Sequence, residues 1–286
     1  MRYRLSQIAQ MCGGVHFGAD VEVCDVVTDS RSCGFGDGAM FVAMRGVNHD
    51  SHDYIADMYR IGIRAFMVER ISLEAEDAGY VCVDNALEAL QRLAAAHRAS
   101  FKGVVVGITG SNGKTIVKEW TARALPTSVK LIASPMSYNS QLGVALSLLM
   151  IEGDEDVALI EAGISEVGEM ERLERMIKPD VVVMTSIGDA HQANFSTLEH
   201  KVREKLMLAH QARRVVFHSD YSEVEKVIAE LQLPFVDAAR QEVDEQPLHN
   251  EAKRVNRQLV KALCEELGYD CMLPVNFDVA MRQEVK

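Results

Sequence analysis

Long apolar segments are missing from this chain of 286 residues. No apolar run reaches the roughly 18 residues of a transmembrane helix, so the sequence predicts no membrane span. The N-terminal stretch Met-Arg-Tyr-Arg-Leu-Ser-Gln-Ile contains no long apolar core of the signal-peptide kind, and we therefore expect a cytoplasmic location. The six cysteines form no Cys-x-x-Cys pair, which argues against a structural zinc site and favours reduced thiols.

An excess of positive charge is also lacking. The chain carries 30 Lys and Arg residues against 42 Asp and Glu residues, a formal net charge of −12. This balance argues against nonspecific binding to nucleic acid or to anionic membranes. It does not argue against a phosphorylated substrate, because such a site needs only local positive charge. No Ser-His-Asp or Cys-His signature is present, so a mechanism with a nucleophilic side chain is not expected.

A glycine-rich phosphate loop is the most informative feature that is present. Residues 107–115 read Gly-Ile-Thr-Gly-Ser-Asn-Gly-Lys-Thr and follow the apolar run 104–106. Glycines let consecutive backbone N–H groups turn toward one anion, and a helix starting here would add its positive N-terminal end. Lys114 would contact the β- and γ-phosphates, and the Thr115 hydroxyl can ligate Mg²⁺. The segment therefore predicts binding of a nucleoside triphosphate.

The spacing of this loop departs from the common Gly-x-x-x-x-Gly-Lys-[Ser/Thr] pattern, which would place glycine at Ile108. The alternative is an ordinary Gly/Ser/Asn turn followed by an exposed lysine. A strand before the loop and a helical pattern after it favour the phosphate-loop interpretation. The helical positions are Val117, Trp120, Thr121 and Leu125.

The pattern of apolar residues predicts two parts that differ in the order of their helices and strands. In the first part we expect helices over 5–11, 52–61 and 86–100, and strands over 21–28, 40–44, 64–68 and 80–83. In the second part we expect strands over 103–108, 131–133, 157–160, 181–185, 215–218 and 235–236, with helices between them. The continuous apolar strands of the second part indicate a parallel sheet that is buried on both faces.

The sequence thus predicts an α/β protein with two domains. A small mixed α/β N-terminal domain would span residues 1–101, and a P-loop-type parallel sheet domain with helices on both faces would span residues 102–286. In such a sheet, ligands bind outside the carboxyl ends of the strands.

Polar residues follow two of the expected strands at that edge. Glu161 comes directly after the strand 157–160, and the strand 181–185 runs into a loop that contains Asp189 and His191. A carboxylate near a phosphate loop is a natural Mg²⁺ ligand. The alternatives are a surface carboxylate and a structural histidine. Lys205 lies in a helical stretch and, taken alone, would be a solvated helix lysine.

Several spaced motifs resemble those of the Mur ligases, the ATP-dependent amide-forming enzymes of peptidoglycan assembly. In the second part they are residues 109–115, 134–149, 162–170, 187–191 and 196–205, and in the first part residues 28–31, 40–46 and 50–54. They occur in the family's order and resemble most closely its MurF branch, in particular the MurF half of the fused MurF–alanine racemase proteins. The resemblance covers residues 1–215 well.

The resemblance implies a role for each matching residue. The ATP-binding residues would be Gly110, Ser111, Asn112, Gly113, Lys114 and Thr115, with Asn250 and Asn256 on the adenine side and His249 beside them. The Mg²⁺ ligands would be Thr115, Glu161 and His191, and Lys205 would match the lysine that is carbamylated in this family. Lys114, Glu161, His191 and Lys205 would be the catalytic set. Ser30, Arg31, Asn48, His52 and Asn139 would bind the UDP-linked substrate.

The implied activity is an ATP- and Mg²⁺-dependent ligation. D-Ala-D-Ala would be added to UDP-N-acetylmuramoyl-tripeptide through an acyl phosphate, with residues 1–101 binding the UDP-muramyl peptide and residues 102–286 binding ATP. The sheet domain looks shortened after residue 218, and the family's third domain and the racemase domain have no counterpart in the sequence. We therefore expect this chain alone to bind its ligands but to form little or no amide product.

Three alternatives remain open. The chain could be a nucleotide-binding fragment or a degenerate paralogue without turnover, and the missing third domain favours this interpretation. It could be another ligase of the superfamily, such as MurE or the folylpolyglutamate synthetase type, although the segment around Asn139 favours MurF over both. The third alternative is a P-loop kinase or GTPase.

Overall fold

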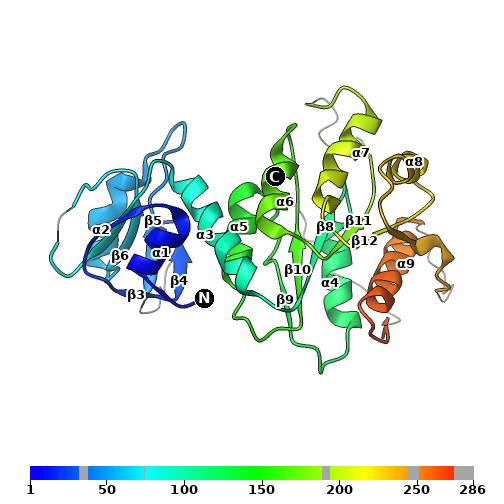
Figure 1. The fold of residues 1–286 in the computed structure, drawn as a ribbon, viewed down its shortest axis with the longest axis horizontal. Coiled ribbons are helices and arrows are strands. Elements are labelled where there is room, and N and C mark those ends of the chain that lie inside the picture. The colour runs from blue at the N-terminus through cyan, green and yellow to red at the C-terminus, as the bar shows by residue number, and fades with distance from the viewer. Residues whose placement is uncertain (32–37, 74, 189–193, 244–250, 274–286) are drawn as a thin grey trace. The chain divides into compact units, whose positions relative to one another are not determined.

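The computed structural model describes residues 1–31, 38–73, 75–188, 194–243 and 251–273 (Figure 1). It forms two compact units: Met1–Phe101 with Ala145–Gly153, and Lys102–Val144 with Asp154–Lys286. The boundary after Phe101 is the one expected from the sequence, but the assignment of 145–153 to the first unit was not expected. No helix among the described residues has the length and apolar character needed to cross a bilayer.

The first unit contains a five-stranded sheet in the order β2-β7-β6-β5-β4, in which only β2 runs antiparallel to its neighbour. Its strands are β2 (Val15–Gly18), β4 (Asp25–Val27), β5 (Ala39–Val42), β6 (Ala65–Val68) and β7 (Gly79–Cys82). A separate pair is formed by β1 (Tyr3–Arg4) and β3 (Glu22–Val23). The helices are α1 (Leu5–Cys12), α2 (Ile55–Arg60) and α3 (Ala86–Ser100).

Local signals explain where α3 begins and which face it buries. The Asn85 side chain accepts a hydrogen bond from the Glu88 N–H at 3.0 Å, which caps the first turn. Leu90 and Leu93 lie on one face and are fully buried. Burial of each such side chain stabilises the fold by roughly 1.5–3 kcal/mol, so the helix is held mainly by this packing.

The second unit contains a six-stranded parallel sheet in the order β13-β12-β11-β8-β10-β9. Its strands are β8 (Val104–Thr109), β9 (Leu131–Ala133), β10 (Val157–Glu161), β11 (Val181–Met184), β12 (Arg214–Phe217) and β13 (Phe235–Asp237). Its helices are α4 (Lys114–Ala124), α6 (Glu169–Ile177), α7 (Leu198–Leu206), α8 (Ser222–Glu230) and α9 (Glu251–Glu266). Helix α5 (Gln141–Leu149) contributes residues to both units.

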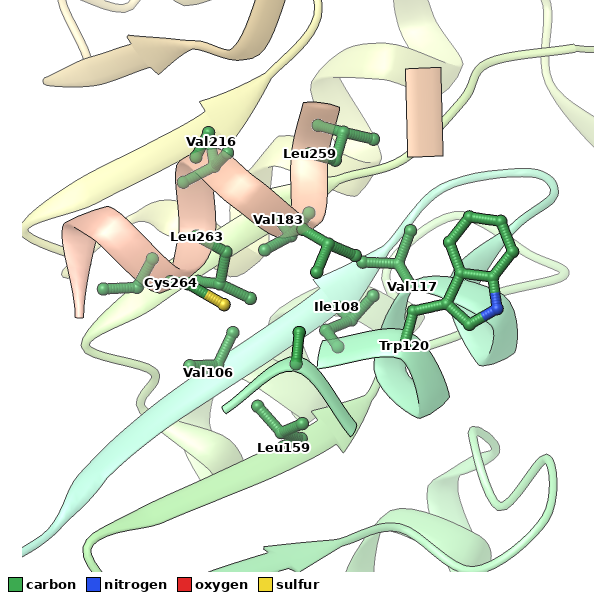
Figure 2. Packing of buried hydrophobic residues seen from close by; sticks show 14 of the residues in the cluster. Val106, Ile108, Val117, Trp120, Leu159, Val183, Val216, Leu259, Leu263 and Cys264 are labelled. Carbon is green, nitrogen blue, oxygen red and sulfur yellow. The ribbon is translucent and has the colours of Figure 1, made fainter. Parts of the chain in front are cut away.

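Both faces of this sheet are covered. On one face Val106 and Ile108 of β8 pack with Trp120 of α4 and Leu259 and Leu263 of α9 in a cluster of buried side chains (Figure 2). On the other face a Cβ at Gly107 would lie 3.1 Å from the Leu208 side chain. The parallel, doubly covered sheet is confirmed, and its central strand β8 leads directly into the phosphate loop.

Two local predictions were wrong in detail. The single strand expected over 21–28 is two strands, β3 and β4, because the Cys24 N–H bonds to the Gly38 carbonyl and the two strands pair with different partners. The helix expected over 52–61 begins as a 3-10 turn, Ser51–Tyr54, and becomes α-helical only at Ile55. The Asp50 side chain caps that turn by accepting from the His52 N–H.

Candidate nucleotide-binding site

The phosphate loop occupies the turn between β8 and α4. Gly113 precedes the helix with φ +85°, and Gly110 has φ +141°, so both adopt backbone conformations that favour glycine. A Cβ at Gly110 would lie 2.1 Å from the Thr185 hydroxyl oxygen, which leaves no room for any side chain. The loop therefore lies at the carboxyl end of the sheet, against the end of β11.

The segment that follows β11 holds this loop in place. The Ser111 N–H donates to the Ser186 carbonyl at 2.7 Å, and the Asn112 N–H donates to the Ser186 hydroxyl at 3.1 Å. The Thr185 hydroxyl donates to the Asn112 carbonyl at 2.6 Å. Because the N–H groups of Ser111 and Asn112 are used within the protein, the first turn of α4 is the main remaining source of backbone donors for a phosphate.

Lys114 folds back over its own loop. Its Nζ donates to the Gly110 carbonyl at 3.0 Å and to the Ser111 carbonyl at 3.4 Å. Burial lowers the pKa of Lys114, and the negative charge of Glu161 opposes that effect. The ammonium group is thus kept against the carbonyls of its own loop.

Glu161 and Thr115 bring two hard oxygen ligands together. Glu161 ends β10 and is fully buried, and the Thr115 hydroxyl donates to its Oε2 at 3.2 Å. A hydroxyl and a carboxylate side by side next to a phosphate loop fit a Mg²⁺ site. The expected third ligand, His191, and its neighbour Asp189 lie outside the described residues. The described residues contain no cluster of three or more His, Cys, Asp or Glu side chains suited to a metal.

Lys205 is not a solvated helix lysine. It is buried in α7, 3% exposed, and its Nζ donates to the Gly110 carbonyl at 3.2 Å. Burial lowers the pKa of Lys205 to about 7, and the positive charges of Lys114 and Lys201 add to the effect. The structure thus brings Lys205 to the same glycine as Lys114.

Lys201 is a further site residue that sequence reasoning missed. It lies one turn before Lys205 in α7, is 1% exposed, and donates from Nζ to the Gly188 carbonyl. The carbonyl of Gly188 also accepts from the Ser111 hydroxyl at 3.2 Å, so Lys201 contacts the segment that supports the phosphate loop. The only sequence signal was its spacing of four residues from Lys205, which places both lysines on one helix face.

Asn139 and Asn256 both lie against loops of this site. The Gly163 N–H donates to the Asn139 carbonyl at 2.8 Å, and a Cβ at Gly163 would lie 2.9 Å from the Asn139 side chain. Asn139 therefore lies beside the turn that follows Glu161. Asn256 of α9 is 8% exposed, and its Oδ1 would lie 3.0 Å from a Cβ at Gly113. His249 and Asn250 lie outside the described residues.

In the first unit, the expected UDP-binding residues differ in their surroundings. His52 is buried, its Nδ1 lies 2.5 Å from the Asp50 carboxylate, and its Nε2 accepts from the Glu69 N–H at 2.9 Å. Both ring nitrogens are therefore engaged inside the unit, and the expected contact of His52 with the nucleotide stays a prediction. Hydrogen bonds from His52 hold the pKa of Asp50 well below its usual range.

Arg31, Ser30 and Asn48 are accessible in the same unit. Arg31 forms a two-pronged ion pair with Asp29, with Nε–Oδ1 at 2.9 Å and Nη2–Oδ2 at 2.8 Å, which lowers the pKa of Asp29 to about 2. Ser30 is half-buried and Asn48 is exposed. Arg31 would therefore have to exchange Asp29 for a diphosphate if it binds one.

Comparison with known proteins places these features in a family. The Mur ligase middle domain matches residues 108–267, more than half of the chain. A curated relative, the UDP-N-acetylmuramoyl-tripeptide–D-alanyl-D-alanine ligase of Bacillus subtilis strain 168, is 29% identical over 206 residues. That region covers 71% of this chain and 45% of the relative, so the chain spans less than half of the relative's length.

Solved structures show the same fold. Crystal structure I of MurF from Acinetobacter baumannii matches with a TM-score of 0.81 at 22% identity, over 94% of this chain and 66% of that one. The MurF ligase from Thermotoga maritima in complex with ADP matches with a TM-score of 0.74 at 24% identity, over 87% of this chain and 64% of that one. The predicted resemblance is confirmed, and the P-loop kinase or GTPase alternative is wrong. With its phosphate loop inside the matched region, the chain belongs to the Mur ligase family.

Proposed function

We propose that this chain binds Mg·ATP and a UDP-linked muramyl peptide for a ligase that adds D-Ala-D-Ala to UDP-N-acetylmuramoyl-tripeptide. The observation that carries the proposal is the convergence of Lys114, Thr115, Glu161 and Lys205 around one glycine-rich loop at the carboxyl end of the sheet. The name of the Bacillus subtilis relative supports this choice of substrates, and the ADP complex of the Thermotoga maritima ligase supports the nucleotide.

The proposed reaction has two steps and needs no nucleophilic side chain. The terminal carboxylate of the peptide attacks the γ-phosphate of ATP, which releases ADP and forms an acyl phosphate. The amine of D-Ala-D-Ala then attacks the acyl carbon, loses a proton and expels inorganic phosphate. Lys114 and the N-terminal turn of α4 would hold the phosphates and neutralise their charge. Thr115 and Glu161 would hold Mg²⁺, which supplies further neutralising charge when bound.

Carbamylation of Lys205 is part of the proposal. An uncharged lysine amine can attack carbon dioxide and release a proton, which forms a carbamate with one negative charge. A pKa of about 7 leaves much of Lys205 uncharged near neutral pH. The product would replace a repulsive ammonium beside Lys114 and Lys201 with an attractive carboxylate. Carbamylation would therefore remove the like-charge repulsion of this lysine cluster.

Calorimetric titrations of the protein test the two binding functions separately. We expect saturable binding of Mg·ATP, and binding of UDP-N-acetylmuramoyl-tripeptide that is tighter than binding of UDP alone. No heat of binding with Mg·ATP would contradict the nucleotide site. Binding of Mg·ATP without binding of the UDP-linked peptide would contradict the substrate assignment and favour a nucleotide-binding protein without this ligase role.

Turnover is tested by phosphate release. Phosphate release from ATP that requires both the UDP-linked tripeptide and D-Ala-D-Ala would support the ligase reaction. Release that requires neither would contradict it.

A further inference from the structure

Lys118 is a fully buried lysine next to the candidate site. It lies on the second turn of α4 with 0% exposure. Its Nζ donates to the Ser134 carbonyl at 2.6 Å and to the Met136 carbonyl at 2.6 Å, and it lies 2.9 Å from Oε1 of Glu161. The two carbonyls accept hydrogen bonds from the ammonium group, whereas its contact with Glu161 is a close ion pair, and Oε1 of Glu119 lies 3.5 Å from Nζ on another side. Lys118 therefore joins three segments of the chain at one buried point.

The first consequence concerns the Glu161 carboxylate. Its Oε1 faces Lys118, whereas its Oε2 accepts from the Thr115 hydroxyl at 3.2 Å. One carboxylate oxygen thus faces the Lys118 ammonium, and the other faces the phosphate loop. Because Lys118 is held by two carbonyls, its positive charge lies at a fixed place beside Oε1, while Oε2 is on the side of Thr115.

The second consequence concerns the segment between β9 and α5. Met136 has φ +48°, a left-handed conformation that is unfavourable for methionine, and the residue is 53% exposed. The residue lies in a turn closed by the Tyr138 N–H, which donates to the Pro135 carbonyl at 3.1 Å, and the bond from Lys118 to the Met136 carbonyl holds this turn against α4. Three residues later the segment reaches Asn139, which lies against Gly163. Lys118 thus holds the base of the loop that carries Asn139.

We propose that Lys118 is a positioning residue that couples the nucleotide site to the substrate loop 134–139. It orients Glu161 for Mg²⁺ and sets the position of Asn139 through the Ser134 and Met136 carbonyls. The inference rests on the proposed function, because it takes Glu161 as a metal ligand and Asn139 as a substrate contact.

The Lys118→Met variant tests this role through the Mg²⁺ dependence of ATP binding. The measured quantity is the ratio of ATP affinity with Mg²⁺ to ATP affinity in EDTA, determined by calorimetry. If Lys118 orients Glu161, the ratio should fall about tenfold. If Lys118 were only a counter-charge, its removal would strengthen Mg²⁺ binding and the ratio would rise. A raised or unchanged ratio would overturn the inference.

Lys130→Met is the matched control, because Lys130 is an exposed lysine of the same unit that pairs with Asp154 at 2.6 Å. It should leave the Mg²⁺ ratio unchanged. The comparison requires that the wild-type protein binds ATP more tightly with Mg²⁺ than in EDTA. Absence of Mg·ATP binding to the wild type would overturn the proposed function, whereas normal wild-type binding with an unaffected Lys118→Met variant would overturn only this inference.

A second pair of variants covers the case in which Lys118→Met does not fold. Removing Lys118 takes away the ion-pair partner of the buried Glu161 carboxylate, which is strongly destabilising. The double variant Lys118→Met/Glu161→Gln removes that charge and is compared with Glu161→Gln alone. We expect UDP-N-acetylmuramoyl-tripeptide to bind about tenfold more weakly to the double variant, because the loop has lost its anchor. Equal affinities would show that Lys118 does not position the loop.

Discussion

At the scale of single residues, the site is defined by buried lysines, whose charged form is destabilised by the loss of water. Lys205 is the clearest case, because burial lowers its pKa to about 7 in the folded chain, against 10.5 for a lysine in water. Below pH 7 the buried group is charged in both states, so its full desolvation cost is present. Between pH 7 and 10.5 the unfolded chain binds the proton that the folded chain has lost, so the free energy of unfolding rises with pH.

Replacing Lys205 by methionine should therefore stabilise the protein at low pH. In carbon dioxide-free buffer we expect Lys205→Met to raise the free energy of unfolding by roughly 2–5 kcal/mol at pH 6, since each unit between two pKa values corresponds to about 1.4 kcal/mol. The advantage should shrink steadily as the pH rises toward 10. Urea unfolding at pH 6, 7.5 and 9 measures it. A variant that is less stable than wild type at every pH would contradict the assigned pKa shift.

Lys114 is the residue on which nucleotide affinity should depend most. A charge-assisted contact to phosphate is worth about 1.5–3 kcal/mol, so Lys114→Ala should weaken Mg·ATP binding roughly 10- to 100-fold. The midpoint of thermal unfolding without ligand should stay close to that of wild type, because within the described part of the chain the side chain donates to carbonyls of its own loop. Isothermal titration measures the affinity, with Lys130→Ala as an exposed control. Unchanged affinity would refute the phosphate-loop assignment.

At the scale of elements, the sequence predicted what depends on local signals. The bounds of α3 and β9 agree with the expected 86–100 and 131–133, because apolar spacing, a capping Asn85 and turn residues all point the same way. Strand β2 was missed because it is an edge strand whose apolar residues, Val15 and Phe17, are 58% and 48% exposed. Its place depends on pairing with β7, which no local pattern encodes.

The same limit applies to the site. The phosphate loop and Glu161 were predictable because their chemistry lies in short contiguous motifs at strand ends. Lys118 and Lys201 were not, because an isolated lysine in an amphipathic helix usually faces solvent. The carbonyls that bind Lys118 lie sixteen and eighteen residues further along the chain, and only the fold brings them to it.

The contact between the phosphate loop and the end of β11 gives a prediction for Gly110. A methyl group there would overlap the Thr185 hydroxyl, whose oxygen lies 2.1 Å from the ideal Cβ position. Gly110→Ala should therefore displace the loop and weaken Mg·ATP binding at least tenfold, in addition to the cost of φ +141° for a non-glycine residue.

Gly268→Ala is the matched control for that substitution. Gly268 also has positive φ, +81°, but an added Cβ would meet nothing within 4 Å. It should lower stability by about 1 kcal/mol and leave nucleotide affinity unchanged. Equal effects of the two substitutions on affinity would show that the Gly110–Thr185 contact has no role in shaping the loop.

At the scale of the whole molecule, the chain divides into two compact units with separate cores. If the proposed ligand assignments hold, each ligand stabilises mainly the unit that binds it. A ligand at 100 times its dissociation constant adds about 2.7 kcal/mol to the stability of the state that binds it. Differential scanning calorimetry should show Mg·ATP raising a transition of the second unit and the UDP-linked peptide raising a transition of the first.

Single-tryptophan fluorescence distinguishes the two transitions, because Trp120 lies in α4 of the second unit. Mg·ATP should shift the fluorescence-detected midpoint more than the UDP-linked peptide does. Equal shifts with both ligands would indicate that the two units unfold as one.

The hydrogen bonds from Lys114 to the Gly110 and Ser111 carbonyls affect the rate of nucleotide binding and its entropic cost. These carbonyls accept from the ammonium group much as a ligand oxygen would, so the long side chain is ordered and half-buried within the protein. Most of its loss of rotamer freedom, up to about 2 kcal/mol for a lysine, is thereby incurred during folding and not at binding. When a nucleotide binds, its phosphate oxygens replace the loop carbonyls as acceptors for the Lys114 ammonium. The loop therefore holds this side chain pre-organised for phosphate binding.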